Sequence, residues 1–158
     1  MRHSVKIGVC FGLTSAVITT LGLMVGLESG THLKSVVIGG ILIIAIADAL
    51  SDAMGIHISE ESENKHTPRE IWESTLATFL SKFVFALTFV VPLLFFQLST
   101  AILVDIGWGF FLLSLFSFYI AKEQKKACWG VILEHLVLAA VVILLTHYIG
   151  RWISTMLG

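Results

Sequence analysis

The chain has 158 residues, of which 56% are hydrophobic and only 13% are charged, and its formal net charge is −1. Its mean hydropathy of +0.92 lies far above that of an ordinary soluble domain, so the composition excludes that class and predicts an integral membrane protein. The chain has no basic face of the kind that binds nucleic acid, and we expect no such partner.

Five apolar runs are each long enough to cross about 30 Å of hydrocarbon. They cover residues 5–27, 35–58, 76–98, 101–120 and 129–149. We therefore expect one all-α domain over residues 1–158, with five transmembrane helices and an acidic connection at residues 59–73. The lipid bilayer is its expected surrounding.

The positively charged side chains are unevenly distributed about these runs. The segments on the N-terminal side of the membrane hold Arg2, Lys6, Lys65, Arg69, Lys122, Lys125 and Lys126. The opposite side holds only Lys34 and Arg151. Because Lys and Arg concentrate in cytoplasmic loops, the N-terminus is expected inside and the C-terminus outside. We expect a multi-pass protein of a prokaryotic cell membrane.

The first run carries small residues at spacings of three or four. They are Gly8, Gly12, Ser15, Thr19, Gly22 and Gly26. Such a face lets another helix backbone approach closely, which predicts tight helix packing. The alternative is that the hydroxyls of Ser15 and Thr19 line an ion path.

The second run is an apolar helix with Asp48 and Asp52 set into its middle. At about 100° per residue, its polar residues fall within about a third of the circumference. They are Asp48, Ser51, Asp52, Gly55, Ser59, Ser62, Glu63 and His66. An ionisable group near the bilayer centre costs roughly 2.5–3.5 kcal/mol on insertion scales, so we interpret this stripe as the wall of an ion path. The alternative is a carboxylate pair held by Lys or hydroxyl groups in a packed bundle.

The connection after the second run predicts a helix start and a group of metal ligands. Thr67, Pro68 and Glu70 have the spacing of a capping box, in which the Thr hydroxyl and the Glu carboxylate satisfy the first free backbone amides. The same connection gathers Glu60, Glu61, Glu63, His66, Glu70 and Glu73. Oxygen donors with an imidazole suit Mn²⁺ or Fe²⁺. This group collects a metal at the cytoplasmic mouth, or it is a solvated acidic loop.

The third run places Lys82 at a depth similar to that of Asp52. Lys82 forms an ion pair with Asp52, or its side chain extends to the membrane surface. Pro92 removes one helical hydrogen bond from this run and is a candidate for a kink.

The last two runs each contain acidic residues. Asp105 lies about one turn inside the outer end of the fourth run, as an exit-side ligand or as an interfacial carboxylate at a helix start. Glu134 and His135 open the fifth run, and adjacent residues point about 100° apart on a helix. At most one of them therefore faces the same cavity as Asp52, and we favour Glu134.

No motif of a soluble enzyme is present: the chain lacks a Gly-rich phosphate loop, H-E-x-x-H and G-x-S-x-G. We expect neither enzymatic activity nor a permanently bound cofactor. Any transport would depend on an ion gradient or a partner.

Several short motifs, in order along nearly the whole chain, resemble the vacuolar iron transporter family. They are residues 12–15 (GLTS), 47–55 (ADALSDAMG) with Ser59, 91–94 (VPLL), 139–140 (AA) and 148–151 (YIGR). The resemblance implies five spans and a homodimer that exports Fe²⁺ or Mn²⁺ from the cytoplasm in exchange for protons. It further implies a path between or beside the two first spans.

The chain departs from the family pattern at three positions. The family has Asp where this chain has Phe11, a Ser-Met pair where it has Ser51 and Asp52, and Gly-Glu where it has Gly55 and Ile56. The long cytoplasmic metal-binding helices of some members are replaced by the short acidic connection. One carboxylate is thus lost from the first span and another is gained in the second.

These observations together predict a transporter of a divalent transition metal, Fe²⁺ or Mn²⁺, as substrate. We expect Asp48 and Asp52 as central ligands, assisted by Ser51, Ser15 and Glu134. Metal is collected by Glu60, Glu61, Glu63, His66 and Glu70, and Lys82 is the candidate ion-pair partner. Two alternatives remain: a membrane scaffold or regulator that does not transport, and a carrier of another cation.

Overall fold

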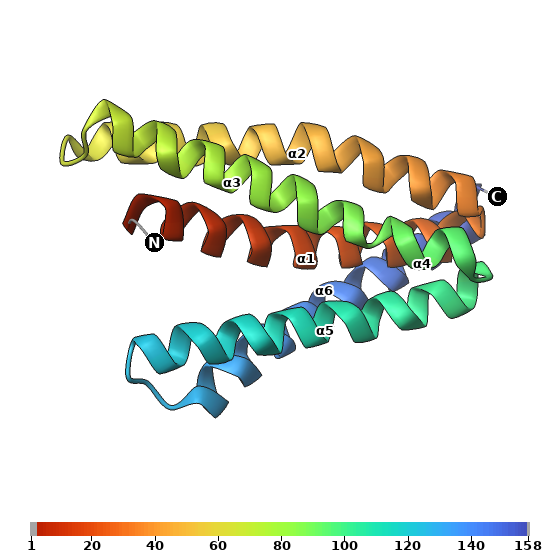
Figure 1. Ribbon diagram of the computed structural model, residues 1–158. Coiled ribbons are helices and arrows are strands. Elements are labelled where there is room, and N and C mark those ends of the chain that lie inside the picture. Colours follow the sequence, from red (N-terminus) through yellow and green to blue (C-terminus); the bar gives the residue numbers. More distant parts are fainter. Residues whose placement is uncertain (1–2, 158) are drawn as a thin grey trace.

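The computed structural model describes residues 3–157, which form a bundle of long helices joined by short connections (Figure 1). In chain order the helices are α1 (His3–Thr31), α2 (Lys34–Glu63), α3 (Pro68–Thr88), α4 (Val90–Phe95), α5 (Leu98–Glu123) and α6 (Cys128–Leu157). No strand occurs in this part of the chain, so the all-α prediction is confirmed.

Within residues 3–157, five helical stretches are long and apolar enough to cross a membrane. They are α1, α2, the α3–α4 stretch Pro68–Phe95, α5 and α6. The five predicted runs thus correspond to five helices, which fits a multi-pass membrane protein. Figure 1 places the N-terminus, the α2–α3 connection and the α5–α6 connection at one end of the bundle, here called the N-terminal end.

Helix α1 is the centre of the bundle, because it packs against α2, α3, α5 and α6. Its Val17, Leu21 and Met24 are completely buried and belong to one apolar core with Ile41 of α2 and Phe89 at the end of α3. The outer faces of α2, α5 and α6 instead expose many Leu, Ile and Phe side chains. Such faces suit lipid rather than water.

The glycines of α1 allow two neighbouring backbones to approach closely. A Cβ atom on Gly8 would lie 2.3 Å from the Ser74 carbonyl oxygen of α3, and one on Gly12 would lie 2.6 Å from the Thr78 carbonyl oxygen. Farther along α1, a Cβ atom on Gly22 would lie 2.7 Å from the Val142 side chain of α6. The small residues of α1 therefore serve close packing, first with α3 and then with α6.

We expect Gly8→Ala to destabilise the protein by about 1–3 kcal/mol, because the new methyl group would force α1 and α3 apart. The thermal unfolding midpoint of the purified protein in detergent measures the effect. Gly55→Ala is the matched control, since nothing lies within 4 Å of a Cβ atom at that position of α2. Equal midpoints for the two variants would contradict the close approach of α1 and α3.

The connection between α2 and α3 has the predicted capping box. Helix α2 ends at Glu63, and Asn64 adopts a left-handed conformation with φ of 53°. The Thr67 amide donates to Glu70 Oε2 at 2.9 Å, and the Glu70 amide donates to Thr67 Oγ1 at 3.4 Å. The start of α3 at Pro68 follows from these residues.

The third predicted span is divided into two helices, α3 and α4, which meet at Phe89. Pro92 has no amide hydrogen to donate to the carbonyl of Thr88, four residues earlier. At the junction, the Phe89 amide donates to the Ala86 carbonyl at 3.2 Å, a spacing of three residues in place of the four of an α-helix. The helix is therefore interrupted near the proline, as its position suggested.

Candidate cation site between α2 and α3

Lys82 of α3 is almost completely buried and lies against two carboxylates of α2. Its Nζ is 2.5 Å from Asp48 Oδ2 and also contacts Asp52 Oδ2. The two aspartates are four residues apart, so one turn of α2 presents both to the same neighbour. Of the two arrangements expected for Lys82, the structure has the ion pair and not a side chain extended to the membrane surface.

Ser15 of α1 completes the group. Lys82 Nζ donates to Ser15 Oγ at 2.8 Å, and Ser15 Oγ donates to Asp52 Oδ2 at 2.6 Å. Thr19 takes no part, because its hydroxyl donates to the Ser15 carbonyl at 2.8 Å. We call Ser15, Asp48, Asp52 and Lys82 the Lys82 cluster; it joins α1, α2 and α3 near the middle of α2.

The members of the Lys82 cluster differ in accessibility. Only 2% of the Lys82 side chain is exposed, against 32% for Asp48 and 22% for Asp52. The ammonium is thus enclosed by the bundle, whereas the carboxylates reach its outer surface. With both carboxylates ionised and the lysine protonated, the cluster has one negative charge in excess, which favours the binding of a proton or another cation.

More polar contacts continue between α2 and α3 toward the N-terminal end. His57 Nδ1 and Thr75 Oγ1 share a hydrogen bond of 3.0 Å, and Ser74 Oγ donates to Glu60 Oε2 at 2.5 Å. Glu60 lies about 12 Å along the helix axis from Asp52, at a rise of about 1.5 Å per residue. We call these two pairs and the Lys82 cluster together the polar column.

A cavity of about 390 Å³ opens at the N-terminal end of the bundle, and its lining includes Ser4 of α1 and Glu70 and Glu73 of α3. Glu73 Oε2 accepts from Ser4 Oγ at 3.2 Å. Glu73 lines the cavity and directly precedes Ser74 in the sequence, so the cavity lies beside the turn of α3 that carries the Glu60–Ser74 pair. The polar column therefore begins close to this cavity.

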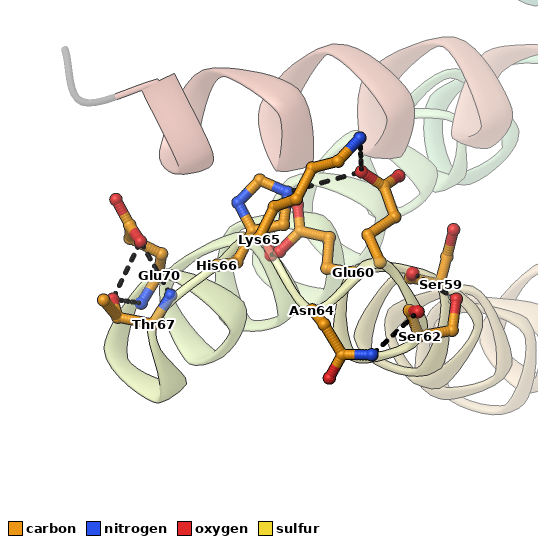
Figure 2. Close-up of polar contacts among 10 residues, drawn as sticks. Ser59, Glu60, Ser62, Asn64, Lys65, His66, Thr67 and Glu70 are labelled. Atoms are coloured by element: carbon orange, nitrogen blue, oxygen red, sulfur yellow. Dashed lines mark hydrogen bonds and ion pairs between the residues drawn. The ribbon is translucent and has the colours of Figure 1, made fainter.

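The acidic connection does not form a metal-binding group within one chain. Glu60 is buried against Ser74, while Glu61 and Glu63 are exposed. Figure 2 shows Glu70 turned back to Thr67, the residue that it caps. Among the described residues, no three His, Cys, Asp or Glu side chains are arranged to hold a metal ion.

Glu63, the nearest partner of the histidine in this connection, makes long contacts. Its Oε2 is 3.8 Å from His66 Nε2 and 3.9 Å from Lys65 Nζ, and both basic side chains are drawn in Figure 2. The residues predicted to collect a metal are thus separated: Glu60 is buried, Glu70 caps α3, and Glu63 makes exposed contacts with Lys65 and His66.

Two other predicted ligands lie away from the Lys82 cluster. Ser51 is exposed on the outer face of α2. Glu134 is exposed on α6, a helix that packs against α1 and α5. Of the adjacent pair, His135 rather than Glu134 is turned toward a neighbouring helix, where its Nδ1 lies 2.7 Å from Ser117 Oγ of α5. The preference for Glu134 as a residue facing Asp52 is therefore corrected.

Sequence reasoning missed the middle of the polar column, which consists of His57, Thr75 and Ser74. A signal was present, because Ser74, Thr78 and Lys82 follow one another at intervals of four and share a face of α3. A histidine inside an apolar helix, about one turn from Asp52, was the matching signal on α2.

Two comparisons with known proteins found no match. No protein-family model matches the chain, and no curated protein matches it significantly. The resemblance to the vacuolar iron transporter family therefore depends on the short motifs of the sequence.

Proposed function

We propose that this protein is a membrane carrier that exchanges a cation for protons at Asp48 and Asp52. The observation that supports it best is the Lys82 ammonium, which lies between two carboxylates near the middle of a membrane-spanning helix. The lysine acts as a tethered cation, occupying the place that a transported ion takes during the cycle. A buried ammonium can also give up its proton, which lets one group serve as counter-ion and proton donor.

Charge balance defines the exchange. The empty cluster is neutral when Lys82 is protonated and the two aspartates share one proton. A bound divalent ion neutralises both carboxylates, so the shared proton and the lysine proton must leave. One divalent ion therefore releases about two protons, and the exchange moves no net charge.

We expect the transported ion to be Mn²⁺ or Fe²⁺. Carboxylate and hydroxyl oxygens are hard ligands that suit these ions better than Cu⁺. The motifs shared with the vacuolar iron transporter family support the same substrates and export from the cytoplasm of a prokaryotic cell. The polar column and the cavity at the N-terminal end would then lead from the cytoplasm to Asp52.

The carrier is expected to be a homodimer. Asp48 and Asp52 keep 32% and 22% of their side-chain surfaces exposed on one chain, near the middle of α2. A charged group facing lipid at this depth is unfavourable, so a second copy of the chain would cover this face. That copy would also supply the ligands that one chain lacks.

Transport into proteoliposomes that enclose a pH-sensitive dye tests the proposal. We expect inward flux of Mn²⁺ or Fe²⁺ to be accompanied by opposite proton movement without a membrane potential, and Asp48→Asn to lose both. Proton movement driven by another ion, without competition from Mn²⁺, would indicate a different cation as substrate. Absence of flux under every pH gradient would favour the scaffold or regulator.

A further inference from the structure

Asp105 of α5 is a buried carboxyl group outside the polar column. None of its surface is exposed within a single chain. Within residues 3–157, neither of its carboxylate oxygens has a hydrogen-bond partner. The sequence suggested a position about one turn inside the helix, but α5 begins at Leu98, so Asp105 lies about two turns inside it.

The surroundings of Asp105 are apolar. Helix α5 packs against α1, α4 and α6. One turn from Asp105, Gly109 faces α1, where a Cβ atom on it would lie 2.6 Å from the Leu21 side chain. One turn in the other direction, Ala101 and Ile102 belong to the apolar core. Asp105 is thus enclosed by the part of the bundle that excludes water.

Among the described residues, none of the ionisable side chains of these helices forms a hydrogen bond with Asp105. Helix α4 has none, and the others have His3, Lys6, Cys10 and Glu28 on α1, Tyr119, Lys122 and Glu123 on α5, and Cys128, Glu134, His135, His147, Tyr148 and Arg151 on α6. Lys6 pairs with Glu123, and Glu28 lies 3.5 Å from His32. His135 and His147 contact the hydroxyls of Ser117 and Ser29.

An ionised carboxylate without a partner is strongly unfavourable in such surroundings, and a carboxyl group there keeps its proton instead. A neutral carboxyl group carries no charge that must be balanced. The complete burial of Asp105 inside one chain also means that a second copy could not supply the missing partner without opening the contact between α1 and α5.

We propose that Asp105 is a proton-binding site, separate from the Lys82 cluster, which holds a proton at neutral pH in this conformation. It exchanges that proton only when the α1–α5 contact opens. The proposal does not depend on cation transport, because it follows from the burial and the lack of partners at Asp105 alone. It concerns a carboxyl group that the proposed exchange at Asp48 and Asp52 does not use.

Infrared spectroscopy of the protein in lipid at neutral pH tests this proposal without any transport assay. The spectrum of the wild-type protein minus that of Asp105→Asn is expected to contain the carbonyl stretching band of a protonated carboxyl group. The matched control repeats the comparison in a second background: the spectrum of Asp48→Asn minus that of the double variant Asp48→Asn/Asp105→Asn should contain the same band. Ionised-carboxylate bands in the difference spectrum, in place of the carbonyl band, would overturn the proposal.

A second measurement keeps the test decisive if Asp105→Asn does not fold. Wild-type protein labelled with carbon-13 at its aspartate carboxyl groups distinguishes protonated from ionised side chains by their chemical shifts. We expect a protonated aspartate signal that exchanges slowly with deuterated water, as burial requires, and that remains in Asp48→Asn and in Asp52→Asn. If every aspartate is ionised at neutral pH, Asp105 is not a proton-binding site in this conformation.

Discussion

Asp52→Asn is expected to abolish cation–proton exchange while leaving the protein folded. Asp52 Oδ2 is the atom at which α1, α2 and α3 meet, because it accepts from Ser15 Oγ and contacts Lys82 Nζ. The variant removes the excess negative charge of the cluster, and Asp48 remains as a counter-ion for Lys82. A divalent ion would then bind more weakly by about 3 kcal/mol or more, roughly a factor of 100.

Mn²⁺ flux into proteoliposomes measures the loss of exchange, and calorimetric titration with Mn²⁺ measures the weaker binding. Ser51→Ala is the matched control: Ser51 neighbours Asp52 in sequence but is exposed on the outer face of α2, so flux should be unchanged. Size-exclusion chromatography and circular dichroism establish that both variants are folded. Normal flux through Asp52→Asn would refute the role of this carboxylate.

The presence of the helices, the start of α3 and the break in the third span could be predicted because their causes are local. An apolar run of about 20 residues must satisfy its backbone hydrogen bonds internally within a bilayer, which makes it helical. Thr67 and Glu70 mark the start of α3 through contacts that involve only neighbouring residues. Pro92 likewise interrupts the third span because it lacks an amide hydrogen.

Which side of each helix packs against its neighbours could not be predicted with the same success. A helical projection groups Asp48, Ser51 and Asp52 on one side of α2, but it does not say where α1 and α3 lie. The structure shows that the completely buried line of α2 passes through Ala45 and Ala49, with the aspartates beside it and Ser51 exposed. Ala45, Ala49 and Ala53 recur every four residues, which is a signal of close packing that a projection of the polar residues alone does not use.

The errors at α5 and α6 have a related origin. Both helices are apolar on every side, so their periodicity does not reveal which face packs inward. The choice between Glu134 and His135 therefore had no physical basis in the sequence, and the structure turns His135 toward α5. The depth of Asp105 was underestimated because its helix begins earlier than the apolar run suggested.

Lys82→Met is expected to strengthen the binding of a divalent ion by about tenfold or more at neutral pH. Lys82 occupies the space between Asp48 and Asp52, and its ammonium must lose its proton before a divalent ion is fully accommodated. Methionine has a similar length and no charge. In this variant the negative charge of the two carboxylates would be neutralised only by protons or by the transported ion. Turnover should fall, because an ion bound more tightly leaves more slowly.

The dependence of binding on pH separates this role from a purely structural ion pair. In the wild-type protein, binding of Mn²⁺ should keep strengthening as pH rises above neutrality, since a lysine proton must be released. In Lys82→Met only carboxyl protons are displaced, so the strengthening should level off at a lower pH than in the wild-type protein. Isothermal titration calorimetry from about pH 6 to about pH 9 would measure the affinity for Mn²⁺ of both proteins as a function of pH.

Lys82→Arg supplies the matched control, because it keeps a positive charge that does not give up its proton. Binding of Mn²⁺ to this variant should be weaker than to the wild-type protein, the opposite of the effect of methionine. If both substitutions weaken binding equally, or if both only lower the thermal unfolding midpoint, Lys82 is a structural partner of the aspartates and does not compete with the transported ion. If methionine strengthens binding and arginine weakens it, the charge of Lys82 controls access to Asp48 and Asp52.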